Sequence, residues 1–274
     1  MALNAVDLQA LVEEVCELAV AAGETILNIY SRDFSVVQKS DLSPLTEADM
    51  ASHHILQKGF DQLTPTIPVL SEEGGSFSFR ERQAWDQLWL IDPLDGTREF
   101  IKRNGEFTVN ISLVAGSKAV LGVIYAPVTS ECYFAYTGGG AYKRDAAGKI
   151  VQIHTRQWDG GHIVVAGSRS QRTQNFERFL AGFSSYETIT LGSALKSCVV
   201  AEGRADIYAR FGPTCEWDTA AAQIIVEEAG GRMMALDGSD LTYNRRESLL
   251  NPSFMVVGDG RHLWKGYLPD CVLT

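Results

Sequence analysis

The densest group of residues that could do chemistry lies in WLIDPLDGTREF, residues 89–100, where Asp92, Asp95 and Glu99 follow an apolar run. Taken alone, this pattern is typical of a turn, because Pro93 suits the second turn position and Asp-Gly is a common turn pair. Here the acids come directly after a strand-like segment, and α/β folds bind ligands where strands end. We therefore interpret Asp92 and Asp95 as functional residues.

Two further acid-rich segments could join them. Glu72 and Glu73 follow a short apolar run in LSEEGG, and Asp218 lies at the start of the helix-like segment WDTAAA. If these acids converge with Asp92 and Asp95, two carboxylates about 5 Å apart repel by about 3 kcal/mol at an effective dielectric of about 20. Such a cluster would protonate or spread apart unless a divalent cation neutralised it, and Mg²⁺ prefers carboxylate oxygens as ligands. The pattern therefore predicts a magnesium site.

A helix start beside the acids adds a position for an anion. Gly96 and Thr97 lie where TREFIK, residues 97–102, turns into a helix, so their backbone N–H groups can bind an anion. Divalent ions and a helix N-terminus around one point are the components of metal-assisted phosphate ester hydrolysis. Glu99 fits a solvated helix face, and the pattern assigns no role to Glu106.

Mixed helices and strands must position these residues in the first part of the chain. Apolar residues at helical spacing predict helices over about 7–30 and 46–62. Thr46 suits the N-cap of the second helix and Asp49 its third position, which is the pattern of a capping box. Short strands precede both acidic segments, and β-branched apolar runs between 107 and 143 predict an antiparallel meander.

From about residue 150 strands and helices alternate. HIVVAGS, YETITLG and ADIYARFG are typical of strands, whereas SQRTQNFERFLAGF, SALKSCVVAEG and EWDTAAAQIIVEEAGG are typical of helices, the last with small alanines that must pack closely. We predict a fold of alternating helix and sheet layers. Its α+β half, residues 1–150, contains an antiparallel sheet and most metal ligands. Its α/β half, residues 151–274, contains Asp218 and the residues that set substrate specificity.

Composition excludes several classes of function. The net charge of −10 and the pI near 5.0 argue against nucleic acid as a partner, because phosphate backbones need a basic surface. No apolar run is long enough to span a bilayer, and the N-terminal segment lacks the basic residues of a secretory signal. The five cysteines form no C-x-x-C pair, which is typical of a reduced, cytosolic chain. The sequence also has no H-x-x-x-H pair, so we do not expect a zinc site.

Four motifs, in order along the chain, resemble those of the inositol monophosphatase superfamily, whose members are Mg²⁺-dependent and Li⁺-inhibited phosphatases. They are SPLTEAD, LSEEGG, DPLDGT and WDTAAAQIIVEEAGG, and the resemblance runs from about residue 10 to residue 257. Within the superfamily, GSALKSCVVAEGRADIYARFGPTCEWDTAA and ESLLNPSF are most similar to the bacterial 3′(2′),5′-bisphosphate nucleotidases of sulfur assimilation.

This resemblance implies a hydrolase that removes the 3′-phosphate of adenosine 3′,5′-bisphosphate, or of 3′-phosphoadenylyl sulfate. It implies two or three Mg²⁺ ions per site, inhibition by Li⁺ and a cytoplasmic location, with peripheral contact at the inner membrane left open. Glu72 then corresponds to a metal ligand, and Asp92 and Asp95 to bridging ligands together with the Leu94 carbonyl. Asp218 corresponds to the ligand of the second metal, near the substrate.

The remaining site residues are also implied by the resemblance. Thr97 corresponds to the hydroxyl that orients the attacking water, and Asp49, with Glu73 as the weaker candidate, to the acid behind it. The amides of Gly96 and Thr97 form the phosphate-binding position, which the metal ligands also line. The positions that hold the nucleotide correspond to Ser193, Lys196 and Arg210.

Spacing alone favours simpler roles for three of the other residues. Lys196 would be a solvent-facing residue of its helix, Arg210 could pair with any acid, and Trp217 is a candidate core anchor. Other functions also remain open. The same chemistry could act on inositol monophosphate or a sugar bisphosphate. An aspartyl-phosphate phosphotransferase would need D-x-D spacing where this chain has D-x-x-D, and a catalytically inactive binding protein would lack at least one motif acid.

Overall fold

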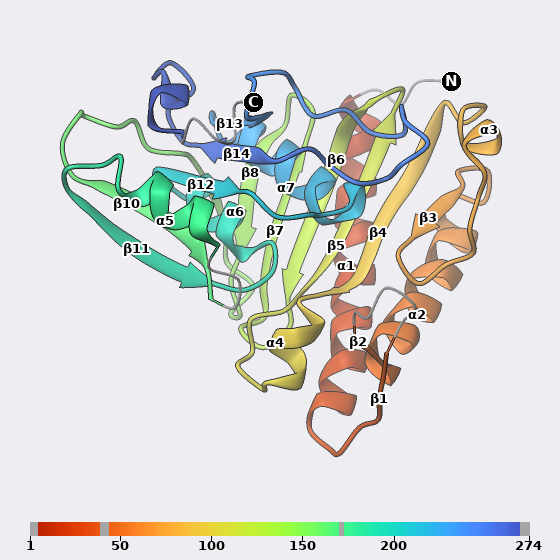
Figure 1. The fold of residues 1–274 in the computed structure, drawn as a ribbon. Helices are drawn as coiled ribbons and strands as arrows, with labels where there is room; N and C mark the ends of the chain where they lie inside the picture. The colour runs from red at the N-terminus through yellow and green to blue at the C-terminus, as the bar shows by residue number, and fades with distance from the viewer. Residues whose placement is uncertain (1–4, 39–43, 170–172, 269–274) are drawn as a thin grey trace.

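A seven-stranded sheet lies at the centre of the computed structural model, which describes residues 5–38, 44–169 and 173–268 (Figure 1). Its strands follow one another in chain order: β3 (Val69–Ser71), β4 (Gln87–Asp95), β5 (Thr108–Ala115), β6 (Lys118–Ala126), β7 (Glu131–Tyr136), β8 (Gly140–Arg144) and β9 (Ile150–Ile153). Strand β3 pairs parallel with β4, and every later pair is antiparallel. The predicted antiparallel meander is therefore confirmed.

Two long helices cover one face of this sheet, α1 (Ala5–Tyr30) and α2 (Glu47–Leu63) (Figure 1). Both were predicted from apolar spacing, and both are confirmed. The predicted capping box of α2 is also present. The Thr46 hydroxyl accepts a hydrogen bond from the Ala48 amide, and the Thr46 amide and hydroxyl both donate to the Asp49 carboxylate. Alternate residues of β4, Trp89 and Ile91, pack into the core beneath these helices.

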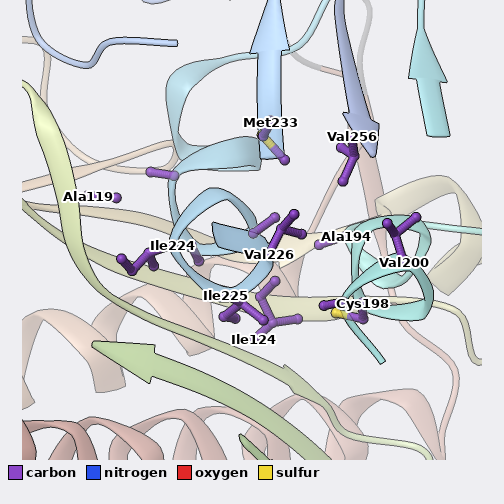
Figure 2. Close-up of a cluster of buried hydrophobic side chains, with 14 of the residues drawn as sticks. Ala119, Ile124, Ala194, Cys198, Val200, Ile224, Ile225, Val226, Met233 and Val256 are labelled. Carbon is purple, nitrogen blue, oxygen red and sulfur yellow. The ribbon is translucent and has the colours of Figure 1, made fainter. Parts of the chain in front are cut away.

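The opposite face of the sheet is covered by α6 (Leu195–Ala201) and α7 (Glu216–Glu228), which lie side by side (Figure 2). Close contact explains the alanine-rich face of α7. A Cβ atom at Gly122 of β6 would lie 2.6 Å from the carbonyl oxygen of Ala221, so glycine is needed there. The predicted close packing of this helix is confirmed.

A second sheet of five strands covers α6 and α7 from the other side. Its strands are β10 (Ile163–Ser168), β11 (Tyr186–Leu191), β12 (Ile207–Arg210), β13 (Arg232–Ala235) and β14 (Phe254–Val257), in the order β11-β10-β12-β14-β13. Strand β10 is parallel to both β11 and β12, as the alternating pattern predicted. Val164 and Ala166 face α6 and α7, whereas Ile163 and Val165 face α5 (Gln174–Leu180), which packs outside the sheet.

The short elements complete this layered α/β fold, whose class is confirmed. They are β1 (Val36–Gln38), β2 (Pro44–Thr46), α3 (Phe79–Arg82), α4 (Thr97–Ile101) and the 3-10 helix Trp264–Tyr267. The chain passes from the seven-stranded sheet to the five-stranded sheet between Ile153 and Ile163, near the predicted boundary. Helix α7, however, belongs to the second half of the chain and packs on the seven-stranded sheet of the first half. The division near residue 150 therefore stays a prediction. In the described ranges, no helix is both long and apolar enough to cross a membrane.

Candidate functional site

A bulge at the end of β4 directs its acids toward one place. The pairing of β4 with β5 shifts register between Asp92 and Asp95, and a bulge of this kind re-aims the side chains around it. Asp92 accepts a hydrogen bond from the Leu94 amide at 3.0 Å. Ser52 of α2 donates to the Pro93 carbonyl at 2.7 Å, which fixes the turn from below. The motif is thus held by its own backbone and by a neighbouring helix.

Three elements bring their acids together at this bulge. Strand β3 runs parallel to β4, and the Glu72 amide donates to the Ile91 carbonyl at 3.1 Å, so Glu72 lies beside the end of β4. Asp218 occupies the third position of α7, where its carboxylate accepts from the Cys215 amide at 2.8 Å. One oxygen each of Glu72, Asp92 and Asp218 lies within 4.8 Å of the other two.

The electrostatics of this cluster are those of a cation site. Burial, followed by repulsion from Glu72, Asp95 and Asp218, raises the pKa of Asp92. Burial and repulsion from Asp95 raise the pKa of Asp218 to about 8. Arg210 only partly offsets this rise for Asp218. A divalent cation would relieve the repulsion between these carboxylates, and hard oxygen ligands at this separation fit Mg²⁺. The donor set therefore suits the ion that the sequence predicted.

Asp95 is oriented by residues outside the acidic motif. Asn110 of β5 donates to its carboxylate at 3.2 Å, and Thr108 donates to the Asn110 side-chain oxygen at 2.8 Å, which fixes the orientation of the amide. Burial raises the pKa of Asp95, and the positive charge of Lys196 opposes this rise. Sequence reasoning missed Asn110, although a buried Asn within the apolar run FTVNISLV was a visible signal.

Thr97 and Asp49 form a pair beside the carboxylate cluster. The Thr97 hydroxyl donates to one carboxylate oxygen of Asp49 at 3.2 Å. The other oxygen of Asp49 accepts from the amide and hydroxyl of Thr46, at 2.8 and 2.6 Å. Asp49 is only 1% exposed, and this burial raises its pKa. The carboxyl therefore lies behind the threonine and is buried away from solvent.

Positive charge enters the site from the five-stranded sheet and α6. Lys196, at 6% exposure, is buried, so the solvent-facing position expected from spacing alone was wrong. Its ammonium donates to the Ser193 carbonyl and lies 5.4 Å from the Tyr208 ring centroid. Burial lowers the pKa of Lys196 to about 8, and the charge of Asp95 opposes this shift. Arg210 ends β12 and donates to the Pro213 carbonyl at 3.0 Å.

These groups surround one cavity of about 430 Å³. Its volume falls in the usual range for a small-molecule site. Five acidic side chains line it, against three basic ones, so an anionic ligand needs bound cations. The predicted residues that line it are Glu72, Asp92, Leu94, Asp95, Gly96, Thr97, Ser193, Lys196, Arg210 and Asp218. Asp49 and Glu73 do not line it, and Glu73 lies on the turn after β3.

Comparison with known proteins identifies the group to which this architecture belongs. Residues 7–263 match the model of the inositol monophosphatase family. The protein is a member of the inositol monophosphatase family. A curated relative named 3′(2′),5′-bisphosphate nucleotidase CysQ, from Salmonella typhimurium, is 46% identical over 249 residues, which cover 90% of this chain and 99% of the relative. The protein of the same name from Escherichia coli K12 is 45% identical, with the same coverage.

Solved structures of the inositol monophosphatase family have the same fold. CysQ from Bacteroides thetaiotaomicron has a TM-score of 0.81 and 42% identity, covering 91% of this chain and 97% of its own. An inositol monophosphatase from Thermotoga maritima has a TM-score of 0.73 at 24% identity, covering 94% of this chain and 93% of its own, which supports the fold alone.

The structure overturns one expectation about the residues around the cavity. Glu99 was expected on a solvated face, but it is 7% exposed and lines the cavity, so that expectation was wrong. Trp217 packs against the core, as expected of an anchor, and also lines the cavity. Tyr208 was not considered from sequence, although it lies between Lys196 and Arg210 in the cavity wall.

Proposed function

We propose that this protein is a Mg²⁺-dependent phosphatase that removes the 3′-phosphate of adenosine 3′,5′-bisphosphate. The products are AMP and phosphate, and 3′-phosphoadenylyl sulfate would give adenylyl sulfate in the same way. One observation carries the proposal: a single cavity is lined both by a cluster of carboxylates and by Lys196 and Arg210. The names of the relatives with 46% and 45% identity support the choice of a nucleotide bisphosphate.

The metal side of the cavity acts on the phosphate that is removed. Glu72, Asp92, Asp95 and Asp218, with the Leu94 carbonyl, would hold Mg²⁺. Bound Mg²⁺ supplies charge neutralisation of the phosphate and a lower pKa of a bound water. In the reaction the water oxygen bonds to phosphorus, the bond from phosphorus to the 3′-oxygen breaks, and that oxygen takes up a proton.

Thr97 and Asp49 orient the attacking water in this proposal. The Thr97 hydroxyl donates to Asp49 at 3.2 Å, with the Leu94 carbonyl as a second acceptor at 3.4 Å, so its lone pairs are available to accept a hydrogen bond from water in the cavity. Asp49 does not contact the water itself, because its second carboxylate oxygen accepts a hydrogen bond from the Thr46 amide and the residue is buried. The amides of Gly96 and Thr97 are proposed to bind the phosphate oxygens.

The cationic side of the cavity selects a second phosphate. The acid cluster serves any phosphomonoester, so it cannot distinguish one from another. Arg210 has a planar guanidinium suited to a phosphate group, and Lys196 has a buried ammonium in the same wall. We assign the 5′-phosphate of the substrate to these two residues, with Ser193 beside them.

A phosphate-release assay across substrates tests the proposal. With Mg²⁺ present, kcat/KM should be far higher for adenosine 3′,5′-bisphosphate than for inositol 1-phosphate or fructose 1,6-bisphosphate, and EDTA should abolish all activity. A preference for inositol 1-phosphate would overturn the substrate assignment while retaining the family chemistry.

Variants of the cationic wall sharpen the test. Arg210→Gln should lower kcat/KM for the bisphosphate about ten- to a hundredfold, the value of a charge-assisted hydrogen bond. It should affect inositol 1-phosphate far less. Lys196→Ala should do the same but with an added effect on Asp95, whose ionised form the lysine stabilises. Lys143→Ala is the matched control, because this lysine pairs with Glu131 and Glu202 and does not line the cavity.

Three features of the proposal remain predictions for direct measurement. They are two or three Mg²⁺ ions per site, inhibition by Li⁺ at millimolar concentration or below, and action in the cytoplasm with peripheral membrane contact left open. Metal titration, an inhibition curve and cell fractionation measure them in turn.

A further inference from the structure

Glu106, to which sequence assigned no role, joins two distant parts of the chain beside the cavity. Its two carboxylate oxygens accept from the Nη2 and Nε atoms of Arg169 at 2.7 and 2.8 Å, a bidentate ion pair. The same carboxylate accepts from the Gly192 amide at 2.9 Å. Arg169, which directly follows β10, also donates to the Thr190 carbonyl of β11 at 2.7 Å. Glu106 itself lies between α4 and β5, so it ties that loop to the turn before α6.

The turn that Glu106 holds determines where the cationic wall lies. A Cβ atom at Gly192 would be 2.5 Å from the Glu106 carbonyl oxygen, so the two segments are in close backbone contact. Ser193 follows with φ of 45°, a strained conformation for a residue other than glycine. Its carbonyl accepts from the Lys196 ammonium. A strained turn needs support from its surroundings, and Glu106 supplies it.

The same contact reaches the metal side of the cavity. Gly96 has φ of 94°, and a Cβ atom there would lie 3.1 Å from the Glu106 carbonyl oxygen and 3.3 Å from the Ser193 Cβ. The metal cradle, Glu106 and the turn before α6 are therefore packed against one another. A shift of Glu106 changes the distance between the two sides of the cavity.

We propose that Glu106 and Arg169 are a positioning pair that sets the spacing between the metal cluster and the residues that bind the second phosphate. This inference rests on the proposed function. Neither residue lines the cavity, so neither binds substrate. The Glu106 side chain is 16% exposed and that of Arg169 is 46% exposed, so solvent reaches the ion pair from the arginine side. Its two parallel hydrogen bonds fix the relative orientation of the two side chains. The pair acts through Gly192, Ser193 and Lys196.

The test compares two substrates in Glu106→Gln, Arg169→Ala and the double variant at saturating Mg²⁺. We expect each single variant to raise KM for adenosine 3′,5′-bisphosphate about tenfold, with a much smaller change in kcat, because loss of one charged contact is worth that much. The rise in KM for inositol 1-phosphate should be several times smaller. The double variant should lose less than the sum of the two single variants, because the Glu106–Arg169 ion pair is removed in all three.

The ion pair between Asp206 and Arg156 is a matched control, because it has the same bidentate geometry. Asp206 accepts a bidentate pair from Arg156 at 2.6 and 2.5 Å and a backbone bond from Val164, away from the cavity lining. Arg156→Ala should therefore lower stability without changing the ratio of KM values. Equal losses on both substrates in Glu106→Gln, or fully additive losses in the double variant, would overturn the positioning role.

A second measurement separates this inference from the proposed function. Hydrogen exchange in the segment 190–196 should become faster in Glu106→Gln, while exchange in α7 stays unchanged. This measurement needs no substrate, so it tests the positioning pair even if the wild type shows no preference for the bisphosphate. Such a lack of preference would overturn the proposed function and not the positioning pair. Unchanged exchange in 190–196 would show that Glu106 does not hold this turn, and the positioning pair would be ruled out.

Discussion

Replacing Asp218 by asparagine should make the metal-free protein more stable while it abolishes Mg²⁺ binding. Two ionised carboxylates at the 4.8 Å limit of this cluster repel by about 3 kcal/mol at an effective dielectric of about 20. Partial protonation relieves some of that repulsion in the wild type. We therefore expect a gain of about 2 kcal/mol in the free energy of unfolding, which raises Tm by about 4–8 °C in a protein of this size.

The gain should depend on pH in a defined direction. The pKa of Asp218 is raised to about 8 in the folded state, from an ordinary value of 3.8. Between these values the folded wild type binds more protons than the unfolded chain, so its stability falls as pH rises. The amide side chain of the Asp218→Asn variant cannot titrate. The advantage of this variant should thus be absent near pH 4, grow through neutral pH and be complete above pH 8.

Thermal unfolding in EDTA and in Mg²⁺ measures both effects. Mg²⁺ at about a hundred times its Kd should stabilise the wild type by about 2.7 kcal/mol and leave Asp218→Asn unchanged, so the order of Tm values should reverse. The control is Glu81→Gln, because Glu81 occupies the same third position in the capping box of α3 and lies outside the cluster. A variant that is less stable than wild type in EDTA at pH 8 would refute the reasoning.

Three further predictions concern single contacts. In steady-state assays, Thr97→Ala should lower kcat far more than it raises KM, whereas Thr97→Ser should retain most activity, because the hydroxyl alone orients the water. A Thr97→Ala variant whose loss lies mainly in KM would contradict this. Gly122→Ala should cost about 1–3 kcal/mol in urea unfolding, because its Cβ meets the backbone of α7, whereas Gly75→Ala, with no atom nearby, should be neutral. Asn110→Leu should weaken Mg²⁺ binding in calorimetry about tenfold, because Asp95 loses its amide donor; unchanged affinity would contradict it.

Local patterns were sufficient for the longer helices and for the residue types of the site. The capping box at Thr46 and Asp49 involves residues three positions apart, so its geometry follows from the chain itself. The alanines of α7 and the acids at the strand ends were likewise visible as spacing. A resemblance to known motifs then supplied which acids belong together, including Glu72 and Asp218, which spacing alone leaves unconnected.

The contacts that tune the site come from residues far apart in the chain, and no local pattern encodes them. Lys196 was expected at the surface, yet it is buried, because β12 and α7 cover α6 only after the two sheets have assembled. Glu106 meets Gly192 across 86 positions, and that pairing exists only when the β11–α6 turn packs on the loop before β5. Helix starts and candidate ligands are thus readable from spacing, because short-range bonds determine them. Burial, and with it pKa and charge pairing, depends on which distant surfaces meet, and only the packed structure decides that.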